Sequence, residues 1–504
     1  MRRGVQIKRY PRLTHEQQDL IHQISMEILN DPGIIVHGDE PLELLSRAGA
    51  EIGQEDQSGG RRVKIPEKMV MDAVEKAPSE VKLGARDPDN ALVLSPDNPR
   101  VYYGSGSETN FFLETSLKEF TPAEEGDKGT FVFPVYKSRR GKVEDLCNVA
   151  HLANQLENLD FFIRPINIQD DDITEENKDV NKFFASLDNI NKHVMAGITD
   201  LNQVEHVIKL ARLVAGGENQ FLENPVISFI SCVTKSPLLI VEDAALRMLA
   251  ANRNGVPVVI SSSPQGGSTA PIDETGMVSM INAEILAAVV LSQAAREGAP
   301  VVYGSVPVRA RMDNLHDMYG APEFNQYNAA CAQMSHYYGL PNYSAGGVSD
   351  AHVPGIQASV EKMLSHLFVA QSGTNLLHYA FGLLLETQTF CPEQAVLDNA
   401  HIGMIKKTLE EPSVSEDEKE QVLSTIREVM NSPYRIFSRS ARKYMRSGKM
   451  FMGYPFEGGE EKDDTMLQVK EETEKLLQRP RSPLPEDTRE EIFREIPGLL
   501  PRLK

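Results

Sequence analysis

Residues 257–270, which read PVVISSSPQGGSTA, contain the pattern that decides the fold. A β-branched run at 258–260 stops at a small, glycine-bearing loop, and a long apolar helix pattern follows over residues 277–293. A buried parallel strand has this composition, and α/β proteins bind their ligands in loops at the carboxyl ends of such strands. The stretch therefore predicts one strand–loop–helix unit of an α/β protein, with the loop as a candidate site.

The same pattern recurs along the chain. Strands are expected at residues 101–104, 161–168, 193–198, 226–232, 258–262, 301–305, 342–345 and 375–381. Helix-period segments fill most of the gaps, among them 144–156, 204–215, 238–254 and 358–369. Alternating strands and helices predict a parallel sheet. Eight repeats favour an α/β fold of the closed (β/α)8 TIM-type barrel over an open sheet.

Three regions follow from composition. Residues 1–95 are expected to form an N-terminal helical segment, because Thr14 and Gln17 form a capping box and Pro66 stands where a second helix begins. Residues 96–410 hold the (β/α)8 barrel, which is the expected catalytic domain. Residues 411–504 are strongly charged and predict a helical C-terminal appendage that wraps the barrel or another subunit.

Composition excludes several classes of protein. The chain has 504 residues, 41% of them hydrophobic, and its 72 acidic and 52 basic residues give a formal charge of −20, which disfavours a nucleic-acid partner. The N-terminus lacks the apolar core of a secretion signal, and no run approaches the roughly 20 apolar residues of a membrane span. We expect a cytoplasmic protein with no membrane contact. The four cysteines are widely spaced and are expected to be buried free thiols: Cys147, Cys232, Cys331 and Cys391.

The first candidate site is the loop Gln265-Gly266-Gly267. Glycines let a ligand approach the backbone closely, and exposed amides can cradle an anion. The alternative is a turn that merely needs glycine. The loop is neither a dinucleotide fingerprint nor a P-loop.

The second candidate is an excess of aromatic residues near strand ends, in a chain without tryptophan. For any single ring, core packing is the simpler interpretation. Several rings at one barrel mouth would bind a quaternary ammonium, at about 0.5–2 kcal/mol per ring. The residues concerned are Tyr102, Tyr103, Phe111, Phe112, Tyr303, Tyr343, Tyr379 and Phe381.

The third candidate is the loop that holds Asp350 and His352, with His378 after the next strand. Asp350 and His352 could form an acid/base or orienting pair, or could hydrogen-bond a substrate carboxylate. Asp350 could equally cap the following helix. Asp-x-His could supply two metal ligands, but no third ligand stands at a characteristic spacing, so no metal is expected. The residues alone predict a barrel enzyme that acts on a small polar or cationic molecule.

A resemblance extends this interpretation. In order, the strings SPQGGSTAPIDETG, AEILAAVVLSQ, GAPVVYGSVP, PNYSAGGVSDAH, GIQASVEK and NLLHYAFGLLL resemble the trimethylamine methyltransferase family of corrinoid-dependent enzymes. EILNDPGIIVHGDEPLELLSRAGAEI near the N-terminus is similar too, so the resemblance covers about residues 10–410. It implies a (β/α)8 barrel that transfers a methyl group from a methylated amine to the Co(I) corrinoid of a separate corrinoid protein. No tightly bound cofactor is expected in this chain.

The resemblance also narrows the substrate. Trimethylamine-specific members carry pyrrolysine in a barrel-mouth loop, whereas the loop at 349–353 here has ordinary side chains. The chain thus resembles the pyrrolysine-lacking branch, which is associated with quaternary amines such as glycine betaine, proline betaine and carnitine.

Under this hypothesis the site residues take roles. Tyr102, Tyr103, Tyr303 and Phe381 would form the cation box. His352, with the amides of Gln265, Gly266 and Gly267, would hold a substrate carboxylate, oriented by Asp350, and His378 is a further substrate-binding candidate. Arg309 and Arg311 are alternative carboxylate partners, or contacts for the corrinoid protein.

Three alternatives stay open. The chain could transfer methyl groups from an unrelated donor, could bind a cationic osmolyte without catalysis, or could be a metal-dependent barrel hydrolase. A homo-oligomer is compatible with each of them.

Overall fold

A curled sheet forms the centre of the molecule. The structure is a computed structural model that describes residues 4–98, 100–106, 108–121, 130–412, 414–448, 450–459 and 464–504. The sheet has nine strands in the order β1-β7-β21-β20-β17-β15-β12-β11-β10. Eight of these are parallel to one another, and β1 (Val5–Gln6) pairs antiparallel with β7.

All eight expected strands are present, three of them with the predicted bounds. They are β7 (Arg100–Tyr103), β10 (Phe161–Ile163), β11 (His193–Ala196), β12 (Ile227–Ser231), β15 (Val258–Ser262), β17 (Val301–Ser305), β20 (Asn342–Ala345) and β21 (Leu376–His378). The two ends of the parallel set meet at an isolated parallel bridge between Gly104 and Phe161. The sheet therefore curls until its ends touch at this bridge, and a second isolated bridge, between Thr109 and Ile166, joins the segments that follow β7 and β10, without a closing ladder.

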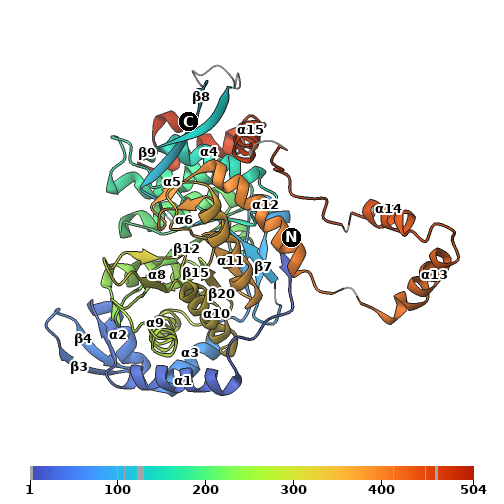
Figure 1. The fold of residues 1–504 in the computed structure, drawn as a ribbon. Coiled ribbons are helices and arrows are strands. Elements are labelled where there is room, and N and C mark those ends of the chain that lie inside the picture. The colour runs from blue at the N-terminus through green and yellow to red at the C-terminus, as the bar shows by residue number, and fades with distance from the viewer. Residues whose placement is uncertain are drawn as a thin grey trace.

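Helices follow the strands and cover the outer face of the sheet (Figure 1). They are α4 (Val143–Gln155), α5 (Glu175–Leu187), α6 (Val204–Ala215), α7 (Glu218–Glu223), α8 (Glu242–Arg253), α9 (Glu274–Ala295), α10 (Pro322–Tyr337), α11 (Ile356–Gln371) and α12 (Pro392–Leu409). Helix α9 corrects the expectation that no run is long and apolar enough for a membrane span, because by length and composition α9 could cross a membrane. Since 89% of its apolar window is buried inside the protein, α9 is a core helix of this fold.

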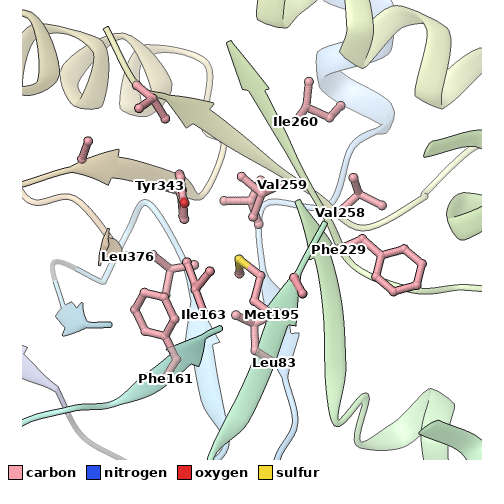
Figure 2. Packing of buried hydrophobic residues seen from close by; sticks show 14 of the residues in the cluster. Leu83, Phe161, Ile163, Met195, Phe229, Val258, Val259, Ile260, Tyr343 and Leu376 are labelled. Carbon is pink, nitrogen blue, oxygen red and sulfur yellow. The ribbon is translucent and has the colours of Figure 1, made fainter. Parts of the chain in front are cut away.

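Side chains of the strands alternate between the enclosed space and the helix layer. Figure 2 shows residues of several strands, among them Met195, Val259 and Tyr343, meeting inside the curl, while Val258 and Phe229 lie on the other side of their strands. Phe229 there packs edge to face on Phe183 of α5, at 5.8 Å between ring centroids. Both faces are buried, which is why most of these strands are rich in apolar residues.

The N-terminal segment is mixed, not helical as expected. Helices α1 (His15–Asn30), α2 (Asp39–Ala48) and α3 (Glu67–Lys76) pack on α9, and Thr14 makes the predicted capping box. Between them β2 (Ile34–Val36), β3 (Glu51–Glu55) and β4 (Arg61–Lys64) join β13 (Thr234–Lys235) and β14 (Leu239–Ile240) in a second sheet, and β5 (Val81–Leu83) pairs with β6 (Leu92–Leu94). These strands escaped prediction because β3 and β4 are short, polar and largely exposed.

A long hairpin was also not foreseen. Strands β8 (Phe111–Phe120) and β9 (Phe131–Arg140) project from the body (Figure 1), and β8 is joined at its base to β23 (Thr389–Phe390), which pairs with β22 (Leu383–Leu384).

The C-terminal part is helical, as expected. Helix α15 (Thr465–Leu477) packs on α12 and α4, and α16 (Glu486–Glu495) packs on α6, so this part wraps the sheet's own helices. Helices α13 (Lys419–Met430) and α14 (Ser438–Arg446) stand away from the body (Figure 1). The described residues also form short 3-10 turns, at Pro88–Asn90, Leu201–Gln203, Glu416–Glu418 and Pro501–Leu503.

Candidate functional site

Four aromatic rings, which we call the ring cluster, meet around the carboxyl end of β21: His378 ends that strand, Tyr379 follows it, Tyr343 is the second residue of β20, and Tyr319 precedes α10. Tyr343 stacks on His378 with 3.8 Å between ring centroids and 14° between planes. The ring of Tyr379 lies 3.8 Å from that of His378, and Tyr319 meets Tyr379 edge to face at 6.3 Å. Tyr343 points into the space that the strands enclose (Figure 2). The ring cluster occupies the edge of the sheet where α/β barrels hold their ligands.

His378 is a neutral polar group within this cluster. Its side chain is fully buried, and neither ring nitrogen has a hydrogen-bond partner among the described residues. Burial lowers the pKa of His378 well below its usual value, so the imidazole carries no charge near neutral pH. One N–H donor and one acceptor of this ring are therefore unused among the described residues.

The backbone beside the cluster is strained and closely packed. Tyr379 has a φ of +68°, in the left-handed region that side chains with a Cβ rarely adopt. Gly106, in the loop after β7, lies so close that an added Cβ would stand 2.6 Å from Cδ1 of Tyr379 and 3.2 Å from Nδ1 of His378. Glycine is required at residue 106 because a larger side chain would clash with these rings, so the loop after β7 packs directly on Tyr379 and His378.

Solvent reaches the opposite side of the same sheet edge. Cys232 and Ser263, which follow β12 and β15, are exposed, and Ile230 is half-buried. Cys331 and Cys391 are buried and Cys147 is half-buried, so the expectation of buried thiols fails for Cys232. The side chains of Cys232 and Ser263 therefore have free surface at this edge, while the surrounding protein still raises the pKa of the Cys232 thiol.

Tyr319 is held by a small sheet and by Asp350. Strands β16 (Gln265–Gly266), β18 (Val308–Ala310) and β19 (Asp317–Met318) pair above the carboxyl ends of β15 and β17. The carboxylate of Asp350 accepts hydrogen bonds from the amides of Tyr319 (2.9 Å) and Gly320 (3.0 Å). Burial, assisted by nearby Glu361 and Glu386, raises the pKa of Asp350 to about 6. Asp350 is thus a positioning residue for the backbone of Tyr319.

The expected pair of Asp350 and His352 is not formed. Asp350 is committed to the two amides, whereas the side chain of His352 is exposed at the rim. Helix capping by Asp350 is also absent, because α11 begins at Ile356 after Gly355.

The amides of the glycine loop are already used. The amide of Gln265 donates to Oγ1 of Thr269, and that of Gly267 donates to the carbonyl of Ala270. Gly267 has a φ of +89°, so the turn itself needs glycine. Gly266 pairs with Arg309 in the small sheet. The predicted anion cradle is therefore a closed turn, and the Gln265 side chain instead holds Asp317 (2.7 Å).

The four rings proposed for the cation box lie elsewhere. The hydroxyl of Tyr303 donates to Oδ1 of Asn282 on α9, at 3.0 Å, so this side chain faces the helix layer. Tyr103 packs against Lys406 and His366, which belong to α12 and α11. The hydroxyl of Tyr102 donates to the carbonyl of Val93. Phe381 lies among Val149 and Leu152 of α4 and Phe390 of β23.

The two arginines differ in their surroundings. Arg309 is half-buried, with Nη2 against Sδ of Met318 (2.7 Å) and Nη1 3.7 Å from Glu323. Arg311 is exposed at the rim, beside Asp313 (3.5 Å). Neither contacts the ring cluster through a described hydrogen bond or ion pair.

A group of charged residues at the same edge was missed, and we call it the Arg164 cluster: Glu108, Arg164, Lys178, Asp179 and Lys182. Burial opposes ionisation of Glu108, but Arg164 and Lys182 outweigh it and hold the pKa of Glu108 at about 2. Burial and Arg164 lower the pKa of Lys182 to about 8. The sequence did contain a signal for this cluster, because Arg164 directly follows the buried apolar strand β10. The predicted strand at 161–168 was too long and included Arg164, so the signal was missed.

A buried ion pair supports the loop after β20. Nζ of Lys362 lies 3.1 Å from Oδ2 of Asp398, and both side chains are fully buried. The same ammonium donates to the carbonyls of Gly347 and Leu383. The pair joins α11 and α12 to the loops that follow β20 and β21.

Comparisons with known proteins bear on this site. The family model described as trimethylamine methyltransferase (MTTB) matches residues 3–116 and 131–440. A trimethylamine methyltransferase of Desulfitobacterium hafniense (strain DSM 10664 / DCB-2) is 33% identical over 402 residues, which cover 80% of this chain and 75% of that protein. A glycine betaine methyltransferase of Desulfitobacterium hafniense (strain Y51) is 27% identical over 415 residues, covering 82% and 80%. A solved dihydropteroate synthase from Xanthomonas albilineans aligns with a TM-score of only 0.35 at 13% identity, covering 66% of this chain and 100% of that one.

Proposed function

Because the chain belongs to the trimethylamine methyltransferase (MTTB) family, we propose that it transfers a methyl group from a quaternary amine to the Co(I) corrinoid of a partner corrinoid protein. The proposal takes the curled sheet as a TIM-type (β/α)8 barrel whose seam is the bridge between Gly104 and Phe161. Its mouth is then the edge that carries the ring cluster, and both substrates meet there.

The ring cluster is the observation that carries the proposal. Three phenol rings and one neutral imidazole pack against one another in the ring cluster, and the imidazole adds no positive charge that would repel a cation. A permanent ammonium is attracted to such faces by about 0.5–2 kcal/mol per ring, most strongly where water is excluded.

The chemistry of a quaternary amine suits this arrangement. The electron pair of Co(I) forms the bond to the methyl carbon, and the pair of the breaking C–N bond stays on nitrogen, which leaves as a neutral tertiary amine. No proton has to be supplied, which agrees with a histidine that is uncharged at neutral pH. The residues at 349–353 are ordinary amino acids, so nothing there offers a covalent adduct for a tertiary amine. The chain's part is to desolvate the cation and aim one methyl group.

The test is a reaction with purified components. The chain is mixed with a reduced corrinoid protein and, separately, glycine betaine, proline betaine, carnitine, choline or trimethylamine, and the loss of Co(I) is followed by absorbance. Loss of Co(I) with at least one quaternary amine, and not with trimethylamine, is the expected result. Silence toward every amine, with no thermal stabilisation by any of them, contradicts the proposal. Stabilisation without Co(I) loss would instead identify a non-catalytic binding protein.

A further inference from the structure

The segment between α12 and α15 carries α13 and α14 away from the body (Figure 1), and we call these two helices the arm. The chain is fixed again where it returns. Tyr454 stacks on His401 of α12, with 5.8 Å between ring centroids and 15° between planes, and Phe456 is buried. Since α12 itself packs on α11 and α15, the arm is held at both ends and is not a loose tail.

Each helix of the arm presents an uncovered apolar face. Val422, Ile426 and Met430 stand at intervals of four along α13, so they share one face, and they are 50%, 43% and 54% exposed. Phe437, which caps α14, and Tyr444, seven residues later, share a face of α14 in the same way. Neither helix has a buried residue. Helices of 12 and 9 residues are stabilised mainly by packing such a face, so the arm needs a partner surface.

Helix α11 presents an apolar face of the same length. Its exposed side chains are those of Ile356, Gln357, Val360 and Leu364, and none of them is charged. Ile356, Val360 and Leu364 stand at intervals of four and are 86%, 61% and 48% exposed, and we call these three residues the α11 stripe. The stripe spans about 12 Å of helix, as does the apolar row on α13. An outer helix in contact with water normally carries charged residues on this face, so the α11 stripe indicates a surface that is covered.

The charge of the arm favours an acidic partner. From residue 431 to residue 456 the sequence has six lysines and arginines and no acidic residue, although the whole chain has a formal charge of −20. The remainder of the chain is therefore even more acidic than the whole. Among the described residues no ion pair neutralises the cations of α14, which are Arg439, Arg442, Lys443 and Arg446.

Carboxylates gather at one end of the α11 stripe. Oε2 of Glu361 accepts from the amide of Asp350 (3.0 Å), and a Cβ added to Gly320 would stand 2.6 Å from Cδ of Glu361 and 3.0 Å from Oδ2 of Asp350. The amide of Glu386 donates to the carbonyl of Ser349 (3.3 Å) in the same loop. In the described part of the chain, no lysine or arginine forms an ion pair with these three carboxylates. The apolar stripe thus ends at an acidic group, which complements a helix pair that is apolar on α13 and basic on α14.

We infer that the arm of one copy of this chain covers α11 of a second copy, with α13 on the α11 stripe and the cations of α14 toward its acidic end. Reciprocal exchange between two copies covers both arms and both stripes in one closed dimer. A membrane or a nucleic acid would match the cations of the arm, but it would leave the α11 stripe uncovered and would repel the acidic remainder of the chain. The inference does not depend on methyl transfer.

Sedimentation of the full chain over a range of concentrations tests the assembly. Wild type is expected to form a dimer. Val360→Asp on the α11 stripe and Ile426→Asp on α13 should each raise the dimer dissociation constant about tenfold or more, because each places a charge in the apolar contact. Leu222→Asp is the matched control: Leu222 is 51% exposed on α7, and its replacement should leave the dimer unchanged.

Disulfide cross-linking tests which surfaces meet. The exposed thiol is first removed by Cys232→Ser, and Val360→Cys and Ile426→Cys are then placed in separate chains. After mixing and oxidation, a disulfide-linked dimer should form from the two different chains, and neither variant should form one alone. This result cannot arise from a change in folding, because it depends on the combination of chains.

Three results would overturn the inference and leave the proposed function standing. The first is a wild type that stays a single chain at every concentration, including one that sediments with phosphatidylserine vesicles, which would assign the arm to a membrane. The second is cross-linking of Val360→Cys with itself, which would show that α11 packs on α11. The third is an internal disulfide, in place of a linked dimer, when both cysteines are in one chain, which would show that the arm folds back on its own body.

Discussion

His378 and Tyr343 stack almost face to face, with ring centroids 3.8 Å apart and planes 14° from parallel. His378 ends β21 and Tyr343 is the second residue of β20, so the stack makes one wall from two adjacent strands whose paired residues lie 33 positions apart in the sequence. Neither ring is charged, so this wall can face a cation without a competing positive group.

Replacing Tyr343 tests the wall directly. Tyr343→Leu removes a π-face, so we expect kcat/KM for methyl transfer to fall about tenfold or more, while Tyr343→Phe keeps the face and stays within about threefold. Tyr303→Phe is the matched control, because its ring faces α9; it should cost about 1 kcal/mol of stability through the lost bond to Asn282 and leave KM unchanged. If Tyr343→Leu lowers kcat/KM no more than Tyr303→Phe does, the ring cluster does not bind the substrate.

Acid should destabilise the protein through its buried histidines. Burial lowers the pKa of His193 to about 4, of His401 to about 4 and of His336 to about 3. In the unfolded chain these groups take up protons below about pH 6.5, and in the folded chain only near pH 4, so the unfolding free energy falls as the pH drops across that interval. Burial raises the pKa of Asp350 to about 6 and also raises the pKa of Glu284, Asp317 and Asp398, and these carboxyls act in the opposite direction. Burial likewise lowers the pKa of His151, His366 and His378, so the histidines that destabilise the folded chain in acid are the larger group.

Chemical denaturation at pH 7, 6, 5 and 4.5 measures this slope. His193→Gln should flatten it, whereas His15→Gln should not, because His15 is exposed. A free energy of unfolding that rises as the pH falls to 4.5 would contradict the prediction that the buried histidines destabilise the folded chain in acid.

The ion pair of Lys362 and Asp398 should be costly to break. Lys362→Met leaves a buried carboxylate without its partner, and we expect a loss of about 3–5 kcal/mol in urea unfolding. Adding Asp398→Leu to Lys362→Met should recover most of that loss. Lys68→Met, at an exposed pair with Asp72, is the control and should change stability by no more than about 1 kcal/mol. If Lys362→Met alone is as stable as wild type, the ion pair of Lys362 and Asp398 does not contribute to stability.

Helices α13 and α14 should contribute little to the stability of one isolated chain. Neither has a buried residue, and they stand away from the body (Figure 1). Deleting residues 414–448 is expected to leave the melting temperature of a dilute sample within about 2 °C of that of the full chain. A drop well beyond this, seen by calorimetry, would mean that the two helices are covered in solution.

The strands were predictable because their signal is local. A β-branched run between a helix end and a glycine-bearing loop has few other solutions, and residues 258–262 and 301–305 appear in the structure with those bounds. Residues 342–345, which read NYSA, were recognised by the glycine loop that follows them. The hairpin of β8 and β9 was not predictable in this way, since its strands carry charged and apolar residues without strict alternation.

The site was less predictable for a physical reason. A strand that is buried on both faces shows no alternation of polar and apolar residues, so its sequence does not reveal which side chains point inward. Tyr303 and Tyr343 both lie on such strands, yet Tyr303 faces α9 and Tyr343 faces the enclosed space. Tyr319 was missed because it lies in a loop after a two-residue strand, β19, whereas His378 was proposed as a substrate-binding residue and does join the ring cluster.

The stoichiometry of a single turnover tests the central claim most directly. The chain, a Co(I) corrinoid protein and glycine betaine are mixed under strict exclusion of oxygen, and the loss of Co(I) is compared with the dimethylglycine formed. We predict one dimethylglycine for each Co(I) consumed, and neither change when the chain is omitted. Co(I) that persists in the presence of betaine and every other quaternary amine, or that disappears without a demethylated product, contradicts the account.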